Sequence, residues 1–140
     1  RRRFSGPFLD RFDVRVLVHR PGVEELLGDE LGESTACVAE RVMRSRSIAL
    51  ERQGVLNARL SGEQLDLFAP VSPKGMELLR QELEHGRLTG RGLHRVRRVA
   101  RTLADRQGSI DVVSDAHIAA ALALRARVAP RRGDDLRSVV

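Results

Sequence analysis

The side chains that most often perform chemistry are few and scattered in this sequence. The histidines are His19, His85, His94 and His117, and Cys37 is the only cysteine. A zinc site needs Cys and His ligands at close, paired spacings, which these positions do not offer. There is no GxxxxGK[ST] loop to cradle a triphosphate, and no signature of a Ser-His-Asp or Cys-His set. We therefore expect a capping or surface role for each histidine, and no catalysis by this chain alone.

Arginine supplies most of the remaining polar chemistry. The formal net charge is +6, and Lys74 is the only lysine. A planar, permanently charged guanidinium can bind phosphate oxygens in pairs, so the composition permits an acidic partner such as nucleic acid or a nucleotide. Acidic residues are also spread along the chain, and the preference for arginine over lysine is general. A basic binding face and a compositional bias without a specific partner both remain open.

The same composition indicates the compartment. A single cysteine cannot form an intramolecular disulfide, which favours a reducing, cytoplasmic setting. No apolar run approaches the roughly 20 residues that a membrane-spanning helix needs, so we expect no membrane partner. The first residues, RRRFSGPFLDRFD, lack an initiator Met and the apolar stretch of a signal peptide, and we expect an internal starting point.

Two elements are expected before residue 54. The stretch 12–19, FDVRVLVH, nearly alternates β-branched and polar residues, which predicts a strand ended by a Pro-Gly pair. A linker follows through residue 31. Apolar residues then recur at helical spacing from the N-cap Ser34 to about Gln53, and Gly54 ends that helix.

Four further helices are expected, each begun by a serine or threonine whose hydroxyl can cap it. The second of them also has proline at its first helical position, a favoured arrangement. The expected ranges, with their caps, are 61–67 (Ser61), 72–85 (Ser72), 89–107 (Thr89) and 114–125 (Ser114). The residues from 130 onward are expected to form a flexible tail.

The expected core is aliphatic, because the chain has no Trp or Tyr and only four Phe. Predicted inward positions are Met76, Leu79, Leu83, Leu93, Val96, Ala100, Leu103, Ala104, Ile118, Ala121 and Leu122, with Arg91, Arg95 and Arg98 roughly opposite. The fold class is therefore mainly α, a small helical bundle preceded by one strand. Since a lone strand needs neighbours, we expect its sheet partners outside this chain, within a longer protein.

Five stretches resemble, in order, motifs of one family. They are SGPFLDRFDV (5–14), GESTACVAERV (32–42), RQGVLNARLSG (52–62), TGRGLHRVRRVARTLADRQGS (89–109) and SDAHIAAALALR (114–125). Together they resemble the C-terminal region of the magnesium chelatase-like AAA+ ATPases, in particular the ComM-like (YifB) family. The resemblance runs from about residue 3 to residue 127.

The resemblance implies roles for two arginines. The family's arginine finger, which acts on nucleotide held by the neighbouring subunit, maps onto Arg11. Its sensor 2 arginine, at the start of the long helix, maps onto Arg91. Both would contact ATP phosphates and act catalytically in the whole protein. The alternative for Arg11 is an ion pair with Asp10 or Asp13, and for Arg91 it is solvent exposure without a ligand.

The resemblance also implies an organisation and a function. Residues 1–31 would end the AAA+ core with the arginine-finger segment, the strand and the linker. Residues 32–127 would form a helical lid of the magnesium chelatase C-terminal type, and 128–140 a tail. The whole protein would use ATP and Mg²⁺, which this chain alone would not bind. Its partners would be its own ATPase core, identical subunits in a ring, expected to be a hexamer, and DNA, on which ComM-like proteins drive branch migration. The alternatives are the ATPase subunit of magnesium chelatase and a stand-alone basic module that binds nucleic acid.

Several arginines of the long helix carry no assigned chemistry. Arg95, Arg98 and Arg101 match family positions, yet such a face is often only solvated or paired with carboxylates. Arg97 stands where the family has an apolar residue, and its stem is expected to snorkel along the edge of the apolar stripe. Gly92 stands where alanine is usual, and it is expected to weaken the first turn by up to about 1 kcal/mol.

Overall fold

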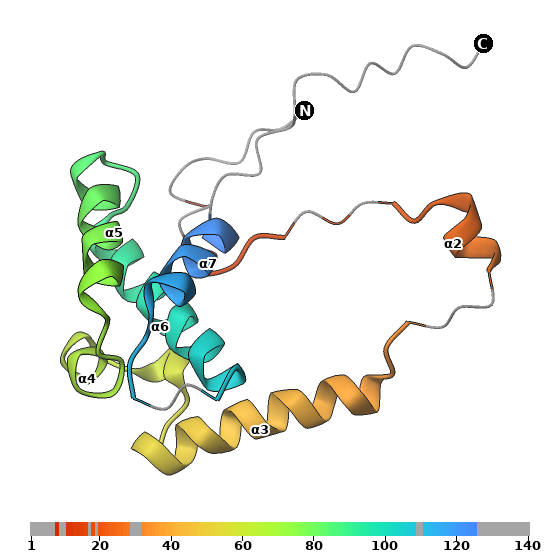
Figure 1. Cartoon of the computed structure of the whole chain (residues 1–140), viewed down its shortest axis with the longest axis horizontal. Coiled ribbons are helices and arrows are strands. Elements are labelled where there is room, and N and C mark those ends of the chain that lie inside the picture. Colours follow the sequence, from red (N-terminus) through yellow and green to blue (C-terminus); the bar gives the residue numbers. More distant parts are fainter. Residues whose placement is uncertain are drawn as a thin grey trace, which may run out of the picture.

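The computed structural model describes residues 8, 11–16, 18, 20–28, 32–108 and 111–125. Helices dominate these residues, which confirms the mainly α class (Figure 1). In chain order they are α2 (Val23–Leu27), α3 (Thr35–Gln53), the 3-10 turn η1 (Asn57–Arg59), α4 (Gly62–Phe68), α5 (Pro73–Glu84), α6 (Gly90–Arg106) and α7 (Asp115–Arg125).

The first long helix begins and ends where the sequence predicts. The Ser34 hydroxyl accepts a hydrogen bond from the Cys37 amide at 3.3 Å and so satisfies one of the free N–H groups of α3. At the other end Gly54 adopts a left-handed conformation, with φ of 73°, and its amide donates to the Leu50 carbonyl. Only glycine takes that conformation without strain, so the helix ends at Gln53.

The predicted caps of the later helices are also confirmed. Ser61 and Gln64 form a reciprocal capping box at the start of α4, with bonds of 3.2 and 2.9 Å. Ser72 caps α5, with Pro73 at its first position, and Thr89 caps α6 by accepting from the Gly92 amide at 3.0 Å. Local sequence signals therefore determine where these helices start.

The N-terminal part leaves the predicted strand untested and contains one helix that was not expected. The described residues between 11 and 18 form no regular element, while residues 17 and 19 lie outside the described part of the chain. The strand predicted for 12–19 stays a prediction, since its expected partners would belong to another part of a longer protein. The expected linker contains the short helix α2, which the sequence analysis missed. The expected tail, 128–140, lies outside the described residues.

Helix α6 lies at the centre of the bundle. It contacts α3, η1, α4 and α7, and α5 packs on α7 (Figure 1). Val71, just before α5, and Val113, just before α7, form an isolated parallel bridge that joins the loops leading into these two helices. The buried aliphatic side chains form one cluster: Leu60, Leu65, Ala69, Leu79, Leu88, Val96, Ala100, Ala104, Val113, Ile118 and Ala121.

Two predicted core positions on α5 are wrong. Met76 and Leu83 are exposed, and only Gly75 and Leu79 of α5 are buried. The reason is that α5 packs mainly against one helix, α7, so a narrow stripe rather than a wide face is covered. On α6 and α7 the prediction holds better, since Val96, Ala100, Ala104, Ile118 and Ala121 are buried while Leu93, Leu103 and Leu122 lie half-buried around them.

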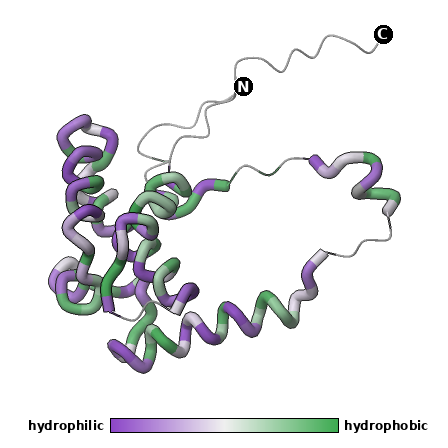
Figure 2. The backbone as a smooth tube through the Cα atoms, in the orientation of Figure 1, coloured by the Kyte–Doolittle hydropathy of each residue, from purple (hydrophilic) through white to green (hydrophobic). Residues whose placement is uncertain are grey.

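The first part of α3 extends beyond the bundle. Figure 2 shows apolar and polar residues alternating along this helix, and Val38, Val42 and Met43 are exposed while Ala49, near its end, is buried. The C-terminal end of α3 is thus the part that the α6 contact holds.

Candidate functional site

Arg91 lies on the first turn of α6, as predicted. Its side chain is exposed, and the first turn of this 17-residue helix contains no acidic residue. The amides at a helix N-terminus carry partial positive charge, which an arginine at this position reinforces. No ion pair of Arg91 is recorded among the described residues. The position can therefore present a cation to an anionic group from outside the chain.

Arg11 is brought to the same helix through its backbone. The Arg95 guanidinium, one turn along α6 from Arg91, donates to the Arg11 carbonyl at 2.5 Å and to the Asp13 carboxylate at 2.9 Å. Asp13, one of the two alternative partners for the Arg11 side chain, is thus paired with Arg95, while Asp10 lies outside the described residues. The Arg11 side chain is exposed. The two predicted site residues consequently belong to one end of α6.

Close packing explains why glycine stands at position 92, which the sequence alone does not reveal. A Cβ at this position would lie 2.9 Å from the Leu88 side chain and 3.2 Å from Nη2 of Arg125. The glycine leaves room for the Arg125 guanidinium to cross the first turn of α6. The expectation that Gly92 only weakens this turn is therefore incomplete, because alanine would have to displace Leu88, Arg125 or both.

Arg97 does not snorkel to water as expected. It is 8% exposed, and its guanidinium bonds to the Asp66 carboxylate at 2.7 Å and to the Leu65 carbonyl at 2.9 Å. A third contact reaches the Ala69 carbonyl at 3.3 Å. Both carbonyls lie at the C-terminal end of α4, where the helix dipole is negative, so a cation there is favoured. The Leu65 carbonyl accepts this bond in addition to the one from the Ala69 amide. Arg97 is a C-terminal cap for α4 supplied by a neighbouring helix.

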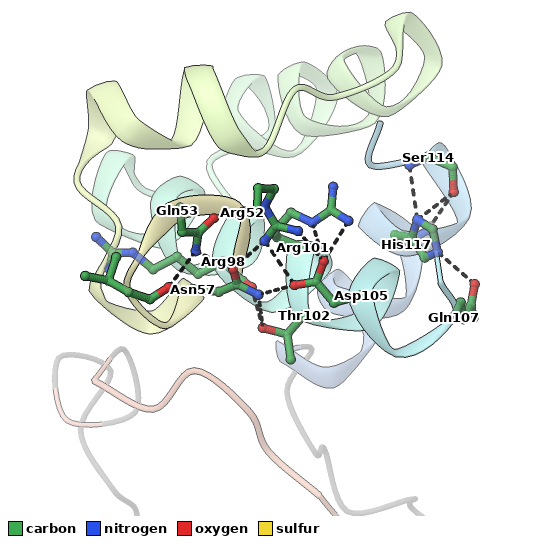
Figure 3. Close-up of polar contacts among 11 residues, drawn as sticks. Arg52, Gln53, Asn57, Arg98, Arg101, Thr102, Asp105, Gln107, Ser114 and His117 are labelled. Carbon is green, nitrogen blue, oxygen red and sulfur yellow. Dashed lines mark hydrogen bonds and ion pairs between the residues drawn. The ribbon is translucent and has the colours of Figure 1, made fainter. Parts of the chain in front are cut away.

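A buried polar network ties α3, η1 and α6 together (Figure 3). The Asp105 carboxylate, fully buried, accepts from Arg101 of the preceding turn at 2.8 and 3.0 Å. It also accepts from Arg52 at the end of α3, at 2.6 and 3.1 Å, and from Asn57 at 2.7 Å. Arg98 adds a bond to the Leu60 carbonyl that follows η1.

Charge and burial act against each other in this network. Burial alone would raise the pKa of Asp105, but the hydrogen bonds from Arg52 and Asn57 and the charge of Arg101 outweigh it, and the pKa is lowered. Burial lowers the pKa of Arg101, although the Asp105 charge opposes that shift. The sequence alone assigns Arg101 no partner. The only available signal was the four-residue spacing from Arg101 to Asp105, which is also common in exposed ion pairs.

His117 is buried, in contrast to the surface role left open for it. Its Nδ1 accepts from the Ser114 amide at 3.1 Å, and its Nε2 lies 2.7 Å from the Gln107 side-chain oxygen (Figure 3). Since Nδ1 accepts a backbone N–H, the proton of the neutral ring is on Nε2 and is donated to Gln107. Burial, helped by the Arg101 charge, lowers the pKa of His117. The ring therefore caps the N-terminus of α7, which is one of the two roles expected for the histidines. Of the other histidines, His85 is exposed, His94 is half-buried and His19 lies outside the described residues.

A hollow of about 350 Å³ lies between α3, η1 and the end of α6. Its lining is mostly apolar, with arginines around it, and it comprises Val38, Arg41, Val42, Ser45, Arg46, Ala49, Leu56, Asn57, Ala58, Thr102, Leu103 and Arg106. It lies at the far end of α6 from Arg91, so it is separate from the two predicted site residues.

Within the described residues no three His, Cys, Asp or Glu side chains gather as metal ligands would. The same part of the chain contains no helix both long and apolar enough to span a membrane.

Comparison with known proteins gives a consistent result. Residues 32–125 match the family model described as magnesium chelatase, subunit ChlI C-terminal. The chain is 38% identical over 128 residues to competence protein ComM of Haemophilus influenzae, which covers 90% of this chain and 25% of that protein. It is 37% identical over 125 residues to the uncharacterized protein YifB of Escherichia coli, covering 89% and 24%. It is 39% identical over 127 residues to the uncharacterized protein Rv2897c of Mycobacterium tuberculosis, covering 88% and 25%.

The chain thus spans about a quarter of the length of the relatives it matches. The matched region contains the whole described bundle from α3 to α7, with Arg91 inside it and Arg11 outside the family model. By the family model and by its relatives, this chain belongs to the magnesium chelatase subunit ChlI C-terminal family and is a C-terminal region of the ComM/YifB type.

Proposed function

We propose that this chain is the helical lid of a ring-forming AAA+ ATPase that remodels DNA by branch migration. The family assignment supports the lid, and the similarity to a competence protein supports DNA as the substrate of the longer protein. In this proposal ATP and Mg²⁺ are bound by an ATPase core that is not part of this chain. Identical subunits, six in the proposed ring, bring one subunit's lid to the next subunit's nucleotide.

The observation that carries the proposal is the arrangement at the first turn of α6. Arg91 is exposed there, beside the amides of a 17-residue helix, and the Arg95 contact brings the Arg11 backbone to the same helix. The Arg91 guanidinium, together with that of Arg11, whose backbone is bound nearby, would neutralise charge that develops on a transferring γ-phosphoryl group. In the proposal Arg11 is the arginine finger, acting on nucleotide of the neighbouring subunit, and Arg91 is sensor 2.

The first test is ATP hydrolysis by the full-length protein with Arg11→Ala or Arg91→Ala. Arginine fingers contribute on the order of 10³-fold or more to the rate of phosphoryl transfer, so we expect Arg11→Ala to lower kcat by at least about a hundredfold. Arg80→Ala is the matched control, because Arg80 is exposed on α5 and its Glu77 contact is long, at 3.8 Å. Wild-type turnover by both site variants, with the fold intact by circular dichroism, would refute the assignment.

Mixed rings test the action between subunits. Arg11→Ala subunits mixed with subunits that cannot hydrolyse ATP because of a core mutation should regain part of the activity. Of the two orientations of a mixed interface, one combines an intact finger with an intact nucleotide site. No recovery at any mixing ratio would contradict action on the neighbouring subunit.

A third measurement separates the proposed substrate from the chelatase alternative. Stimulation of ATP hydrolysis by branched DNA, with migration of the branch point, is the expected result. Stimulation by a porphyrin and a partner subunit, with no response to DNA, would instead assign the longer protein to magnesium insertion.

A further inference from the structure

The hollow between α3, η1 and α6 has an apolar lining that the described residues leave partly uncovered. Val38 and Val42, on its α3 side, are 40% and 50% exposed, and Leu103, on its α6 side, is half-buried. Contiguous apolar surface of this kind marks a place where another group binds. The volume, about 350 Å³, is near the lower end of the range for binding pockets, about 300 to 1,000 Å³, and suits one face of a short helix.

The rim of the hollow is positively charged. Arg41, Arg46 and Arg106 line it, and no acidic residue of the described part of the chain does so. Arg41 is paired with Glu33, whereas no ion pair of Arg46 or Arg106 is recorded in the same residues. A matching occupant therefore combines an apolar face with carboxylates beside it.

Helix α2 has this combination. Val23, Leu26 and Leu27 lie at the i, i+3, i+4 spacing that places side chains on one helical face, and they are 67%, 59% and 79% exposed. The other two residues of the helix are Glu24 and Glu25. The helix lies apart from the bundle (Figure 1), so its own chain leaves this face uncovered. Apolar anchors at such spacing, set into an apolar groove, are a recurring way in which helices bind other chains.

From this match we propose that α2 of one copy of the chain docks in the hollow of a second copy. Its apolar face would cover the valines of α3, and its carboxylates would lie toward Arg46 and Arg106. The helix and the hollow are different surfaces of one chain, so the contact is head to tail rather than symmetric.

A head-to-tail contact leaves each pair of copies with one free helix and one free hollow. Such contacts continue from copy to copy, and they close into a ring where the rotation between neighbours permits. The inference rests on the proposed function for the ring, and it names the surfaces of this region that join neighbouring subunits.

The first test is self-association of this chain, measured by sedimentation at increasing concentration. We expect association in the wild type, and Leu27→Asp should raise the Kd at least about tenfold, because a leucine that leaves water contributes that much to binding. Leu67→Asp is the matched control, since Leu67 is 71% exposed on α4 and does not line the hollow. A wild type that stays monomeric at about 1 mM, or associates no better than Leu27→Asp, would overturn the proposal. An equal loss in Leu67→Asp would do the same.

Chemical cross-linking identifies the two surfaces. In a Cys37→Ser background, chains with Leu27→Cys are mixed with differently labelled chains with Ser45→Cys and treated with a short bismaleimide. Ser45 lines the hollow, whereas Ser47, exposed on the same helix, does not, so Ser47→Cys is the matched control. We expect cross-linking between the two labels to be at least about tenfold faster with Ser45→Cys, because docking raises the effective concentration of the thiols.

Equal rates at positions 45 and 47 would overturn the proposal. A chain with both Leu27→Cys and Ser45→Cys that yields only internally linked monomer, even when concentrated, would also overturn it, since α2 would then occupy the hollow of its own chain. These measurements need no ATP, so they fail independently of the proposed function. Normal ATP hydrolysis in Arg11→Ala and Arg91→Ala would refute that function, while the cross-linking result would still decide the docking.

Discussion

The buried carboxylate of Asp105 allows a demanding prediction about stability. Its side chain and that of Arg101 are both fully buried, and Arg52, which also binds the carboxylate, is 16% exposed. Asp105→Ala would remove the acceptor for five donor atoms: Nε and Nη2 of Arg101, Nη1 and Nη2 of Arg52, and Nδ2 of Asn57. Arg101 would lose the carboxylate that neutralises it, in a place that water does not reach.

The size of the effect follows from this burial. Removing one partner of a buried ion pair costs about 3 to 5 kcal/mol, because the remaining charge stays desolvated. Domains of this size have about 5 to 15 kcal/mol of total stability. Since 1 kcal/mol moves the Tm of a domain of roughly 100 residues by about 4 to 8 °C, Asp105→Ala should lower the Tm by at least about 12 °C.

Urea and thermal unfolding followed by far-ultraviolet circular dichroism measures this loss. Intrinsic fluorescence is a poor probe here, because the chain has no Trp or Tyr. Glu77→Ala is the control for an ion pair at the surface, with a 3.8 Å contact to Arg80, and should change stability by less than about 0.5 kcal/mol. A loss below about 1 kcal/mol in Asp105→Ala would refute the view that this carboxylate compensates a buried charge.

The double variant Arg101→Met/Asp105→Leu separates charge from packing. Replacing both members of a buried pair by apolar residues of similar size is often neutral, whereas removing one is strongly destabilising. We therefore expect the double variant to be more stable than Asp105→Ala, although Arg52 and Asn57 lose their acceptor. If the double variant is equally unstable, lost hydrogen bonds and packing rather than the remaining charge explain the effect.

Two further predictions concern the other close contacts. Gly92→Ala should destabilise the chain by about 1 kcal/mol in urea unfolding, because the new Cβ meets Leu88 and Arg125 and this outweighs the better helix propensity of alanine. Gly90→Ala, on the same turn, is the control: its Cβ has open space, so this variant should be neutral or stabilising. The lowered pKa of His117 means that protonation favours the unfolded chain, so stability should be complete above pH 6.5 and fall as the pH drops below it. His117→Gln should flatten this part of the pH profile and His85→Gln, at an exposed site, should not, and a decline that persists in His117→Gln would show that another group causes it.

The helix boundaries could be predicted from the sequence because their signals are local. Ser34, Ser61, Ser72 and Thr89 each cap a helix through a bond to an amide three residues later, and such bonds need no tertiary partner. The same holds for Gly54, whose left-handed conformation ends α3. A sequence shows these positions directly, since residue type and spacing suffice.

The contacts of the arginines could not be predicted in this way. Arg95 binds residues 82 and 84 positions away, and Arg97 binds residues about 30 positions away. Periodicity places Arg97 at the edge of an apolar stripe, but it does not reveal that the C-terminal carbonyls of α4 lie there. Gly92 was misjudged for the same reason, because its neighbour Arg125 comes from α7. Helix propensity takes account of one helix at a time, whereas the roles of these residues come from contacts between two helices.

The same contacts bear on the interpretation of the positive charge. Along α6, Arg95 is paired with Asp13, Arg97 with Asp66 and Arg101 with Asp105. Carboxylates within the described residues therefore neutralise these three arginines. A face that binds nucleic acid needs several adjacent cations free to displace counterions from phosphates. The first turn of α6 instead offers Arg91, with Arg11 attached nearby, which suits one compact anion better than a long polyanion. Within the proposed function, the charge of this region would therefore suit the phosphates of a single nucleotide, and contact with DNA would belong to other parts of the proposed longer protein.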